Sequence, residues 1–283
     1  VKSAFECYGY APIETPAMEN IGTLTGKYGD EGDRLIFKVL NSGDYLSKAN
    51  LENDTTSKSL TKKIVEKALR YDLTVPFARF VVQNRNEITF PFKRYQMQNV
   101  WRADRTQKGR YREFYQCDAD VIGTDSLLCE VELVQLYDDV FTSLNIPNVD
   151  ICINNRKVLS GMVALMDATS IFDELVIILD KIDNIGIEKV KEEMQSKGVK
   201  ASSLYFLDTF LTAKTVSDLS SLLEQSEIGK KGLEELQFVI DNVTKLGLQS
   251  ANLVFDITLA RGLNYYTGCI LEVKAFTSKM QPV

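Results

Sequence analysis

The chain has 283 residues, of which 45% are hydrophobic and 25% charged, and its formal net charge at pH 7 is −6. This composition is typical of a water-soluble globular protein with one large or two medium domains. The chain contains no histidine, which excludes a histidine base, a histidine metal ligand and every catalytic triad built on imidazole.

The cysteines and the apolar segments define the expected environment. The five cysteines are odd in number and lack any C-x-x-C pair, so we expect reduced thiols rather than disulfides, and no metal site. No apolar run approaches the ~18 residues of a membrane span, and the first residues lack the pattern of a signal peptide. We therefore expect a cytoplasmic protein that does not contact membranes.

The first segments of the chain alternate between extended and helical patterns. Prolines forbid a continuing helix near the start, so Ile13 to Pro16 is expected to be extended. Residues Asp33 to Val39 are predicted to form a strand, and the Asn- and Ser-rich stretch from Asn41 to Ser59 a loop. A short helix is predicted from Leu60 to Leu69.

Two stretches between Phe92 and Gly123 show the period of two that a half-buried sheet imposes. Apolar residues occupy odd positions: Tyr95, Met97, Trp101, Tyr115, Cys117, Ala119 and Val121. The polar residues lie mainly at even positions, with Phe114 in the same register: Arg94, Gln96, Gln98, Arg102, Arg112, Phe114, Gln116, Asp118 and Asp120. The connecting loop contains Gly109, which can adopt a positive φ. We predict a long antiparallel hairpin with one core face and one polar face.

The polar face offers chemistry for two kinds of ligand. Phe114 presents a ring on which a nucleobase could stack. Arg102 can clamp a phosphate, whereas Gln116 with Asp118 or Asp120 can accept hydrogen bonds from an amine. Phosphate and amine recognition on one surface indicates an amino acid plus a nucleotide. The alternative is a hairpin with one solvated face, which antiparallel sheets commonly have.

Positive charge is concentrated around the same hairpin. Seven lysines and arginines lie between Lys93 and Arg112, opposed in that window by Asp104 alone. Because the net charge has the wrong sign for coating nucleic acid, a nucleic-acid partner would need a local basic site of this kind. A solvated charged face is the alternative.

The second half of the chain is mainly helical in pattern. An amphipathic helix is predicted from Asp125 to Leu144, capped by Thr124 or Asp125, and a strand from Val149 to Ile153. The stretch from Gly161 to Leu248 contains no proline and reads as a helical subdomain. Strands are predicted again at 252–259 and 265–273.

Two further segments carry candidate site residues. Leu259 to Gly268 combines a strand, a glycine turn bearing Arg261 and two adjacent tyrosines, although a tight turn with packed aromatics is the alternative. The other segment, Arg70 to Thr74, could equally be a helix end with a solvated aspartate.

Taken in order, these segments resemble the histidyl-tRNA synthetase family of class II aminoacyl-tRNA synthetases. Glu14 to Pro16 is similar to the family's motif 1, and Val100 to Arg102 with Gly109 to Asp118 is similar to motif 2. Arg261 to Gly268 resembles the histidine-specific signature, which disfavours a different class II synthetase. The resemblance covers nearly the whole chain and is weakest in the helical stretch.

The resemblance implies a role for each matching residue. The implied catalytic residues are Arg102, on the α-phosphate of ATP, and Arg261, on the substrate carboxylate and α-phosphate. The implied ATP-binding residues are Arg102, Asp104, Arg110 and Phe114. The implied histidine-binding residues are Asp72, Thr74 and Gln116 for the α-amino group, Asp120 and Tyr266 for the imidazole, with Tyr265 and Arg261 beside them.

The implied reaction is ATP-dependent activation of histidine to histidyl-adenylate, followed by transfer to tRNA(His). ATP is a substrate and Mg²⁺ bridges its phosphates, so no protein metal site is expected. A homodimer is implied through the motif 1 region near Pro16. The rival is a non-catalytic histidine-sensing paralogue such as the regulatory subunit of ATP phosphoribosyltransferase, but Arg102, Phe114, Arg261 and the basic loop favour the enzyme.

The expected fold class is α+β, a class II synthetase-like antiparallel sheet flanked by helices with a helical insertion subdomain. Residues 1–160 and 249–283 are assigned to a discontinuous catalytic core that is expected to be incomplete at both ends. The family's glycine- and arginine-containing N-terminal entry has no counterpart in the sequence, and neither do motif 3 and the C-terminal anticodon-binding domain. Residues 161–248 are assigned to the helical insertion.

Overall fold

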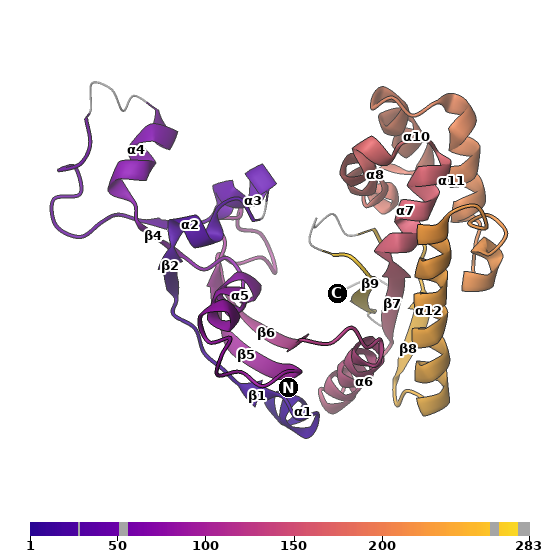
Figure 1. Ribbon diagram of the computed structural model, residues 1–283, viewed down its shortest axis with the longest axis horizontal. Coiled ribbons are helices and arrows are strands. Elements are labelled where there is room, and N and C mark those ends of the chain that lie inside the picture. The colour runs from indigo at the N-terminus through magenta and orange to yellow at the C-terminus, as the bar shows by residue number, and fades with distance from the viewer. Residues whose placement is uncertain (28, 51–55, 261–265, 277–283) are drawn as a thin grey trace. The chain divides into compact units, whose positions relative to one another are not determined.

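The computed structural model describes residues 1–27, 29–50, 56–260 and 266–276, with the backbone alone at 29–31. The described residues form helices and sheets in two compact units, Val1–Asp125 and Ser126–Val283 (Figure 1). The predicted α+β class is confirmed by these mixed elements. The assignment of residues 161–248 to an insertion stays a prediction, since this division falls at a different position.

The first unit contains two small sheets and short helices. Its helices are α1 (Lys2–Cys7), α2 (Ile21–Leu24), α3 (Gly29–Leu35), α4 (Ser57–Ile64) and α5 (Thr74–Gln83). Its strands are β1 (Ala11–Pro12), β2 (Met18–Asn20), β3 (Lys38–Val39), β4 (Lys67–Leu69), β5 (Phe92–Trp101) and β6 (Glu113–Ile122). The described strands pair in the orders β1-β5-β6 and β2-β4-β3.

The predicted hairpin is present as β5 and β6, which pair antiparallel along their full lengths (Figure 1). The register runs from Phe92 opposite Ile122 to Trp101 opposite Glu113, so even-numbered residues of both strands share one face. Gly109 lies in the connecting loop with φ 79°, as its turn position requires.

Two predicted elements in this unit are partly wrong. The strand expected from Asp33 to Val39 is helical at its start, where α3 runs to Leu35, and extended only at β3. The helix expected from 60 to 69 begins earlier, because Thr56 and Ser59 form a reciprocal capping box, and ends at Ile64. Residues 67–69 instead join β2 and β3 as the middle strand of a sheet, so pairing overrides the helical pattern.

The second unit contains a three-stranded sheet and most of the helices. Its helices are α6 (Leu128–Ser143), α7 (Arg156–Leu165), α8 (Phe172–Leu179), α9 (Ile182–Ile185), α10 (Ile187–Ser196), α11 (Leu204–Leu211) and α12 (Glu227–Leu246). Single 3-10 turns occur at η1 (Thr169–Ile171), η2 (Ala201–Ser203) and η3 (Val216–Leu219). Strand β7 (Val149–Asn155) lies between β8 (Ala251–Phe255), which is parallel to it, and β9 (Cys269–Ala275), which is antiparallel.

The largest apolar cluster belongs to this second unit. It joins β7 to one face of α6, α7, α8, α10, α11 and α12, and residues such as Ile151, Leu159 and Leu236 are fully buried. Close contact between α7 and α12 depends on glycine, because a Cβ at Gly161 would lie 2.7 Å from the Cα of Gly229. The helical pattern predicted for 161–248 is confirmed by the elements found there.

The predicted cap of the first long helix is wrong. Helix α6 begins at Leu128 rather than at Asp125, and its N-cap residue Leu127 makes no side-chain capping bond. The carboxylate of Asp138, near the other end of α6, accepts hydrogen bonds from the backbone N–H groups of Gln249, Ser250 and Ala251. This buried aspartate fixes the start of β8 against α6.

Candidate active site

The two faces of the β5–β6 hairpin differ in burial, but not as the sequence predicts. On the predicted core face, Tyr115 is 70% exposed and Cys117 is also exposed. On the polar face, Arg94 and Gln96 are fully buried. The expectation that the apolar face is the core is therefore wrong for its β6 side, because the first unit packs its own segments against the polar face.

The cover of the polar face comes from the start of α5 and the residues before it. Phe77 of α5 lies 6.3 Å from Phe92, measured between ring centroids, and 4.2 Å from the guanidinium carbon of Arg94. Arg94 Nη2 also donates to the carbonyl of Leu73 at 3.4 Å. These contacts place the turn that carries Asp72 over the even-numbered side chains of the hairpin.

A hydrogen-bonded amide network fills one half of this face. Gln98 Oε1 accepts from Arg70 Nη1, from the backbone N–H of Thr15 and from Gln96 Nε2. Gln96 Nε2 also donates to Thr15 Oγ1 at 2.8 Å. Because the Gln98 acceptor is fully used, this network holds the floor of the site rather than offering groups to a ligand.

Gln116 lies directly opposite Gln98 but differs from it in the hydrogen bonding of its side-chain oxygen. Its Oε1 atom is buried and receives no hydrogen bond within the described residues. A buried acceptor without a donor costs free energy, so a ligand that brings an N–H group to Gln116 would recover it. An α-ammonium group fits that requirement.

Three carboxylates, those of Asp72, Asp118 and Asp120, interact electrostatically beside Arg94. Arg94 Nη2 lies 2.5 Å from Asp120 Oδ2. Burial and the charge of Asp120 raise the pKa of Asp118 to about 6, against the lowering effect of Arg94. The pKa of Asp120 is also raised, chiefly by burial. The site therefore holds more acidic groups than its buried cation neutralises, an arrangement suited to a cationic ligand.

Asp72 and Thr74, the candidates for binding the α-amino group of the substrate, lie at the start of α5. Asp72 is buried and its Oδ1 accepts from the backbone N–H of Val75 at 3.1 Å, which fixes the carboxylate at the helix start. Thr74 is the first residue of α5 and is exposed. The negative charge of Asp72 reaches Asp118 and Asp120, since it raises the pKa of both.

Arg102 and Phe114 meet at the other end of the polar face. The guanidinium carbon of Arg102 lies 4.4 Å from the ring centroid of Tyr71 and 5.2 Å from that of Phe114. Arg102 Nε donates to the carbonyl of Tyr71 at 3.1 Å, which leaves the terminal nitrogens for other partners. An arginine oriented between two rings suits a phosphate that carries a base.

The hairpin loop holds the remaining ATP candidates. Arg110 Nε lies 3.7 Å from Asp104 Oδ2, and Arg112 Nε donates to the backbone carbonyl of Asp104 at 3.1 Å. Asp104 and Arg110 are thus brought together as a pair that is exposed on the arginine side. Screening makes such a pair weak, so either partner could turn to a ligand at little cost.

The histidine-specific signature lies in the second unit and mostly beyond what the structure describes. Arg261 and Tyr265 fall outside the described residues. Tyr266 precedes β9 and is half-buried, and the carbonyl of Gly268 accepts from the backbone N–H of Arg156 at 2.8 Å. Their sequence-based roles therefore stay predictions.

The sequence pattern did not single out Arg94, Gln96, Gln98, Thr15 and Arg70 as functional. Arg94 and the two glutamines were placed on the polar face by their even positions, but nothing in that pattern identified their partners. Their burial results from the segment 70–77, which covers the hairpin. A prediction of that burial would require knowing that Asp72 lies above the hairpin. Arg70, with Nη1 at 2.6 Å from the Thr15 carbonyl, forms the link.

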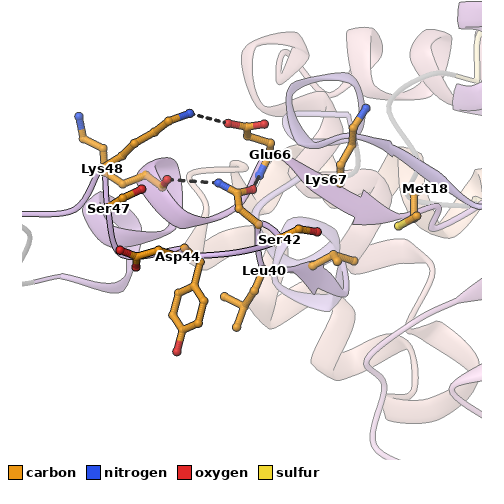
Figure 2. Close-up of a pocket in the computed structure, with 12 residues that line it drawn as sticks. Met18, Leu40, Ser42, Asp44, Ser47, Lys48, Glu66 and Lys67 are labelled. Atoms are coloured by element: carbon orange, nitrogen blue, oxygen red, sulfur yellow. Dashed lines mark hydrogen bonds and ion pairs between the residues drawn. The ribbon is translucent and has the colours of Figure 1, made fainter.

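A separate hollow of about 510 Å³ lies beside the β2-β4-β3 sheet and contains none of the predicted site residues. Figure 2 shows Lys48 and Glu66 joined across it by an ion pair of 3.0 Å. Exposed side chains of Met18, Leu40 and Tyr45 form its apolar part. This hollow is distinct from the polar face of the hairpin.

Neither a cluster of metal-ligating side chains nor a membrane-spanning helix is found among the described residues. Among these residues, no group of three or more Cys, Asp or Glu side chains could hold a metal ion. No helix within the described ranges is long and apolar enough to cross a membrane.

Comparison with known proteins gives consistent results. A family model described as histidyl-tRNA synthetase matches residues 48–281. The histidine-tRNA ligase of Christiangramia forsetii is 55% identical over 97% of this chain and 62% of its own length. That of Flavobacterium johnsoniae is 54% identical over 97% of this chain and 63% of its own length. The chain thus spans less than two thirds of these curated relatives.

Solved structures agree with the sequence matches. The crystal structure of histidyl-tRNA synthetase from Nostoc sp. PCC 7120 has a TM-score of 0.76 and 31% identity, covering 96% of this chain and 59% of that one. A Bacillus halodurans structure, titled as an ATP phosphoribosyltransferase regulatory subunit/histidyl-tRNA synthetase, has a TM-score of 0.75 at 20% identity, with 99% of this chain and 67% of that one covered. The second likeness shows the fold alone.

Proposed function

This chain belongs to the histidyl-tRNA synthetase family, and on that premise we propose that its protein activates histidine with ATP and transfers the histidyl group to tRNA(His). The observation that carries the proposal is the polar face of the β5–β6 hairpin. It combines a buried acceptor without a donor, Gln116, with an arginine oriented between two rings, Arg102.

The chemistry requires no catalytic base. A carboxylate oxygen of histidine attacks the α-phosphorus of ATP, a P–O bond forms, and the bond to pyrophosphate breaks to give histidyl-adenylate. Arg102, and Arg261 by family resemblance, would stabilise the negative charge that develops on the phosphate oxygens. Orientation of the two substrates supplies the remaining rate enhancement. Mg²⁺ would enter with ATP and neutralise phosphate charge.

The described residues support distinct roles on the amino-acid side. Asp72 and Gln116 would accept hydrogen bonds from the α-ammonium group, with Thr74 beside them at the start of α5. Asp120 would accept an N–H of the imidazole. By family resemblance alone, Tyr265 and Tyr266 would complete recognition of the side chain. The excess of carboxylates over Arg94 favours a substrate that brings positive charge.

The described residues also support roles on the nucleotide side. Phe114 would stack on adenine, and Arg102, whose guanidinium carbon lies 5.2 Å from the centroid of that ring, would hold the α-phosphate. Asp104 would lie near the adenine amino group, and Arg110, now 3.7 Å from Asp104, would reach the other phosphates. Both residues lie in the loop, and the Arg110 side chain is exposed, so its movement costs little.

The setting of the reaction is proposed from the family. We propose a cytoplasmic homodimer that pairs through the motif 1 region near Pro16. The basic residues of the hairpin loop and the helices within 161–248 would contact tRNA, since the net charge of −6 on these 283 residues does not favour binding by bulk electrostatics.

Histidine-dependent ATP–pyrophosphate exchange by the complete gene product tests the proposal. Exchange that requires histidine, together with charging of tRNA(His) in a second assay, would support it. Absence of histidine-dependent exchange would refute the enzymatic function.

The second candidate is a histidine-sensing paralogue that charges no tRNA. The Bacillus halodurans structure shares the fold, but its 20% identity does not favour that function over the enzyme. Curated relatives at 54–55% identity are named as ligases. Binding of histidine without any pyrophosphate exchange would favour the sensor.

A further inference from the structure

Arg94 is a buried cation beside the residues that would recognise the substrate side chain. Its side chain is 0% exposed and lies on the even face of β5, directly opposite Asp120 on β6. The guanidinium is fixed from several sides: by the Phe77 ring at 4.2 Å, by the Leu73 carbonyl at 3.4 Å, and by Gln96 Oε1 at 3.3 Å.

The contact between Arg94 and Asp120 is a short ion pair without a well-aligned hydrogen bond. Nη2 and Oδ2 are 2.5 Å apart, yet neither Arg94 Nε nor Asp120 Oδ2 takes part in a hydrogen bond of good geometry within the described residues. Arg94 therefore holds the carboxylate mainly through charge. Both atoms therefore keep unused hydrogen-bonding capacity within the described residues.

An ion pair between a fully buried arginine and a half-buried aspartate is poor evidence for stability. The cost of removing two charges from water often exceeds their attraction, and well-packed apolar residues of similar volume serve folding as well or better. The surroundings of Arg94 make a purely stabilising role less favourable still, because Asp72 and Asp118 add negative charge beside Asp120. Arg94 is the cation that opposes these effects, because its charge lowers the pKa of Asp120.

The other cations of the face are committed elsewhere. Arg70 is bound to the carbonyls of Thr15 and Asn99, and Arg102 is bound to the carbonyl of Tyr71. Arg102 lowers the pKa of Asp118, but it is not among the groups that act on Asp120. The charge and orientation of Asp120 therefore depend on Arg94.

We propose that Arg94 is a positioning residue for side-chain recognition: it holds in place the carboxylate of Asp120, which accepts the imidazole N–H of histidine. This inference deepens the proposed function and rests on it. Arg94 touches no substrate; it acts through Asp120. Loss of Arg94 should thus impair binding of histidine and spare binding of ATP.

The test is pyrophosphate exchange by the complete protein carrying Arg94→Met, which keeps approximate volume and removes charge. We expect the KM for histidine to rise at least about 30-fold, as expected when one partner of a buried charge pair is removed. The KM for ATP should change less than about 3-fold, within the range of a remote surface effect. Equal changes in both KM values, or none, would overturn the proposal.

The pH dependence of kcat/KM for histidine distinguishes a positioning role of Arg94 from a structural one, because a structural role would leave it unchanged. Arg94 lowers the pKa of Asp120, whereas burial and the charge of Asp72 raise it, so the pKa of Asp120 must rise further once Arg94 is lost. The acidic limb of kcat/KM for histidine should therefore move to higher pH in Arg94→Met, and Arg94→Lys should restore part of it. A limb that stays at its original pH in both variants would count against Arg94.

A double variant separates positioning from direct contact. If Arg94 acts through Asp120, Arg94→Met combined with Asp120→Asn should bind histidine about as weakly as Asp120→Asn alone. Additive losses would instead mean that Arg94 acts independently, and the proposal would fail. Should Arg94→Met not fold, Arg94→Lys in the same cycle provides the same comparison.

Arg79→Met is the matched control. Arg79 Nε lies 2.8 Å from Oε2 of Glu19, and this pair, like Arg94–Asp120, belongs to the first unit and joins one buried partner to one half-buried partner. Its loss should leave the KM for histidine unchanged, even where the thermal midpoint falls. If the unmodified protein shows no histidine-dependent exchange, the proposed function fails. If it is active and Arg94→Met is unselective, this inference alone fails.

Discussion

Arg102 is the side chain whose position most directly joins structure to chemistry. It lies between the rings of Tyr71 and Phe114, and its Nε is bound to a backbone carbonyl, so the orientation of its terminal nitrogens is set before a ligand arrives. Such preorganisation is the main source of electrostatic stabilisation in phosphoryl chemistry.

Replacement of Arg102 by alanine should slow adenylate formation about 10²-fold or more, the usual effect of losing one preorganised charge stabiliser. Single-turnover formation of histidyl-adenylate measures it. Arg105→Ala is the matched control, because Arg105 is an exposed arginine three positions further along the loop. Similar losses in both variants would show that bulk positive charge, rather than Arg102, acts in the step.

The raised pKa of Asp118 predicts a pH-dependent stability. Its pKa is about 6 in the folded protein, compared with ~3.9 in the unfolded chain. Between these values the native state binds more protons, so this group makes the free energy of unfolding fall as pH rises from about 4 to about 6.

Asp118→Asn should remove that dependence. The difference in unfolding free energy, variant minus unmodified protein, should become more positive as pH rises from about 4 to about 6 and stay constant above about 7. Urea denaturation at several pH values measures this difference. A difference that is flat across the window would show that Asp118 has an ordinary pKa.

The sequence predicts the residues of this site better than it predicts their partners. Even spacing alone places Arg94, Gln116 and Asp120 on one face, because a strand turns each second side chain the same way. Which residues face each other depends on the register, in which Arg94 lies opposite Asp120. The register and the cover from α5 are tertiary properties, so the buried ion pair could not be predicted.

Helices α7 and α12 pack so closely that a side chain added at their contact would meet backbone atoms. A Cβ on Gly161 would lie 2.7 Å from the Cα of Gly229 and 3.2 Å from its backbone nitrogen. Backbone atoms cannot move aside as a flexible side chain can. The two helices would have to separate, and the apolar residues that both contribute to the core would lose contacts.

Gly161→Ala should therefore lower the free energy of unfolding by about 1–3 kcal/mol, the usual cost of overpacking. The helix propensity of alanine opposes this loss only by about 1 kcal/mol. Gly22→Ala is the control, since a Cβ at Gly22 in α2 meets nothing within 4 Å. Chemical denaturation of both variants measures the contrast, and equal stabilities would show that α7 and α12 can move apart freely.

Long periodic elements were predicted more successfully than short ones. The hairpin strands extend over ten residues each, enough for a period of two to be unambiguous. The expected strand at 33–39 failed because only Lys38 and Val39 pair, and short apolar runs do not distinguish helix from strand. The expected core face of the hairpin is wrong on its β6 side because polarity alone does not reveal which face another segment covers.

The molecule as a whole distributes its apolar core unevenly between the two units. In the second unit, one continuous cluster joins β7 to six helices. In the first unit, the polar face of the hairpin replaces part of such a core with the Arg94, Gln96 and Gln98 network. A site that must present charged and amide groups to a ligand leaves less apolar area to stabilise its own unit.

This difference predicts unequal protection from hydrogen exchange. Strand β7 is buried and hydrogen-bonded on both sides, by β8 and β9, whereas β6 pairs only with β5 among the described strands and has exposed side chains at Tyr115 and Cys117. Amides in peptides from β7 should therefore open only in global unfolding, and those from β6 through smaller openings of lower free energy. Mass spectrometry of exchange over a denaturant series distinguishes the two. If β6 amides show the same protection and the same denaturant dependence as β7 amides, the chain unfolds as one cooperative body, and the polar hairpin is stabilised by more than the contacts described.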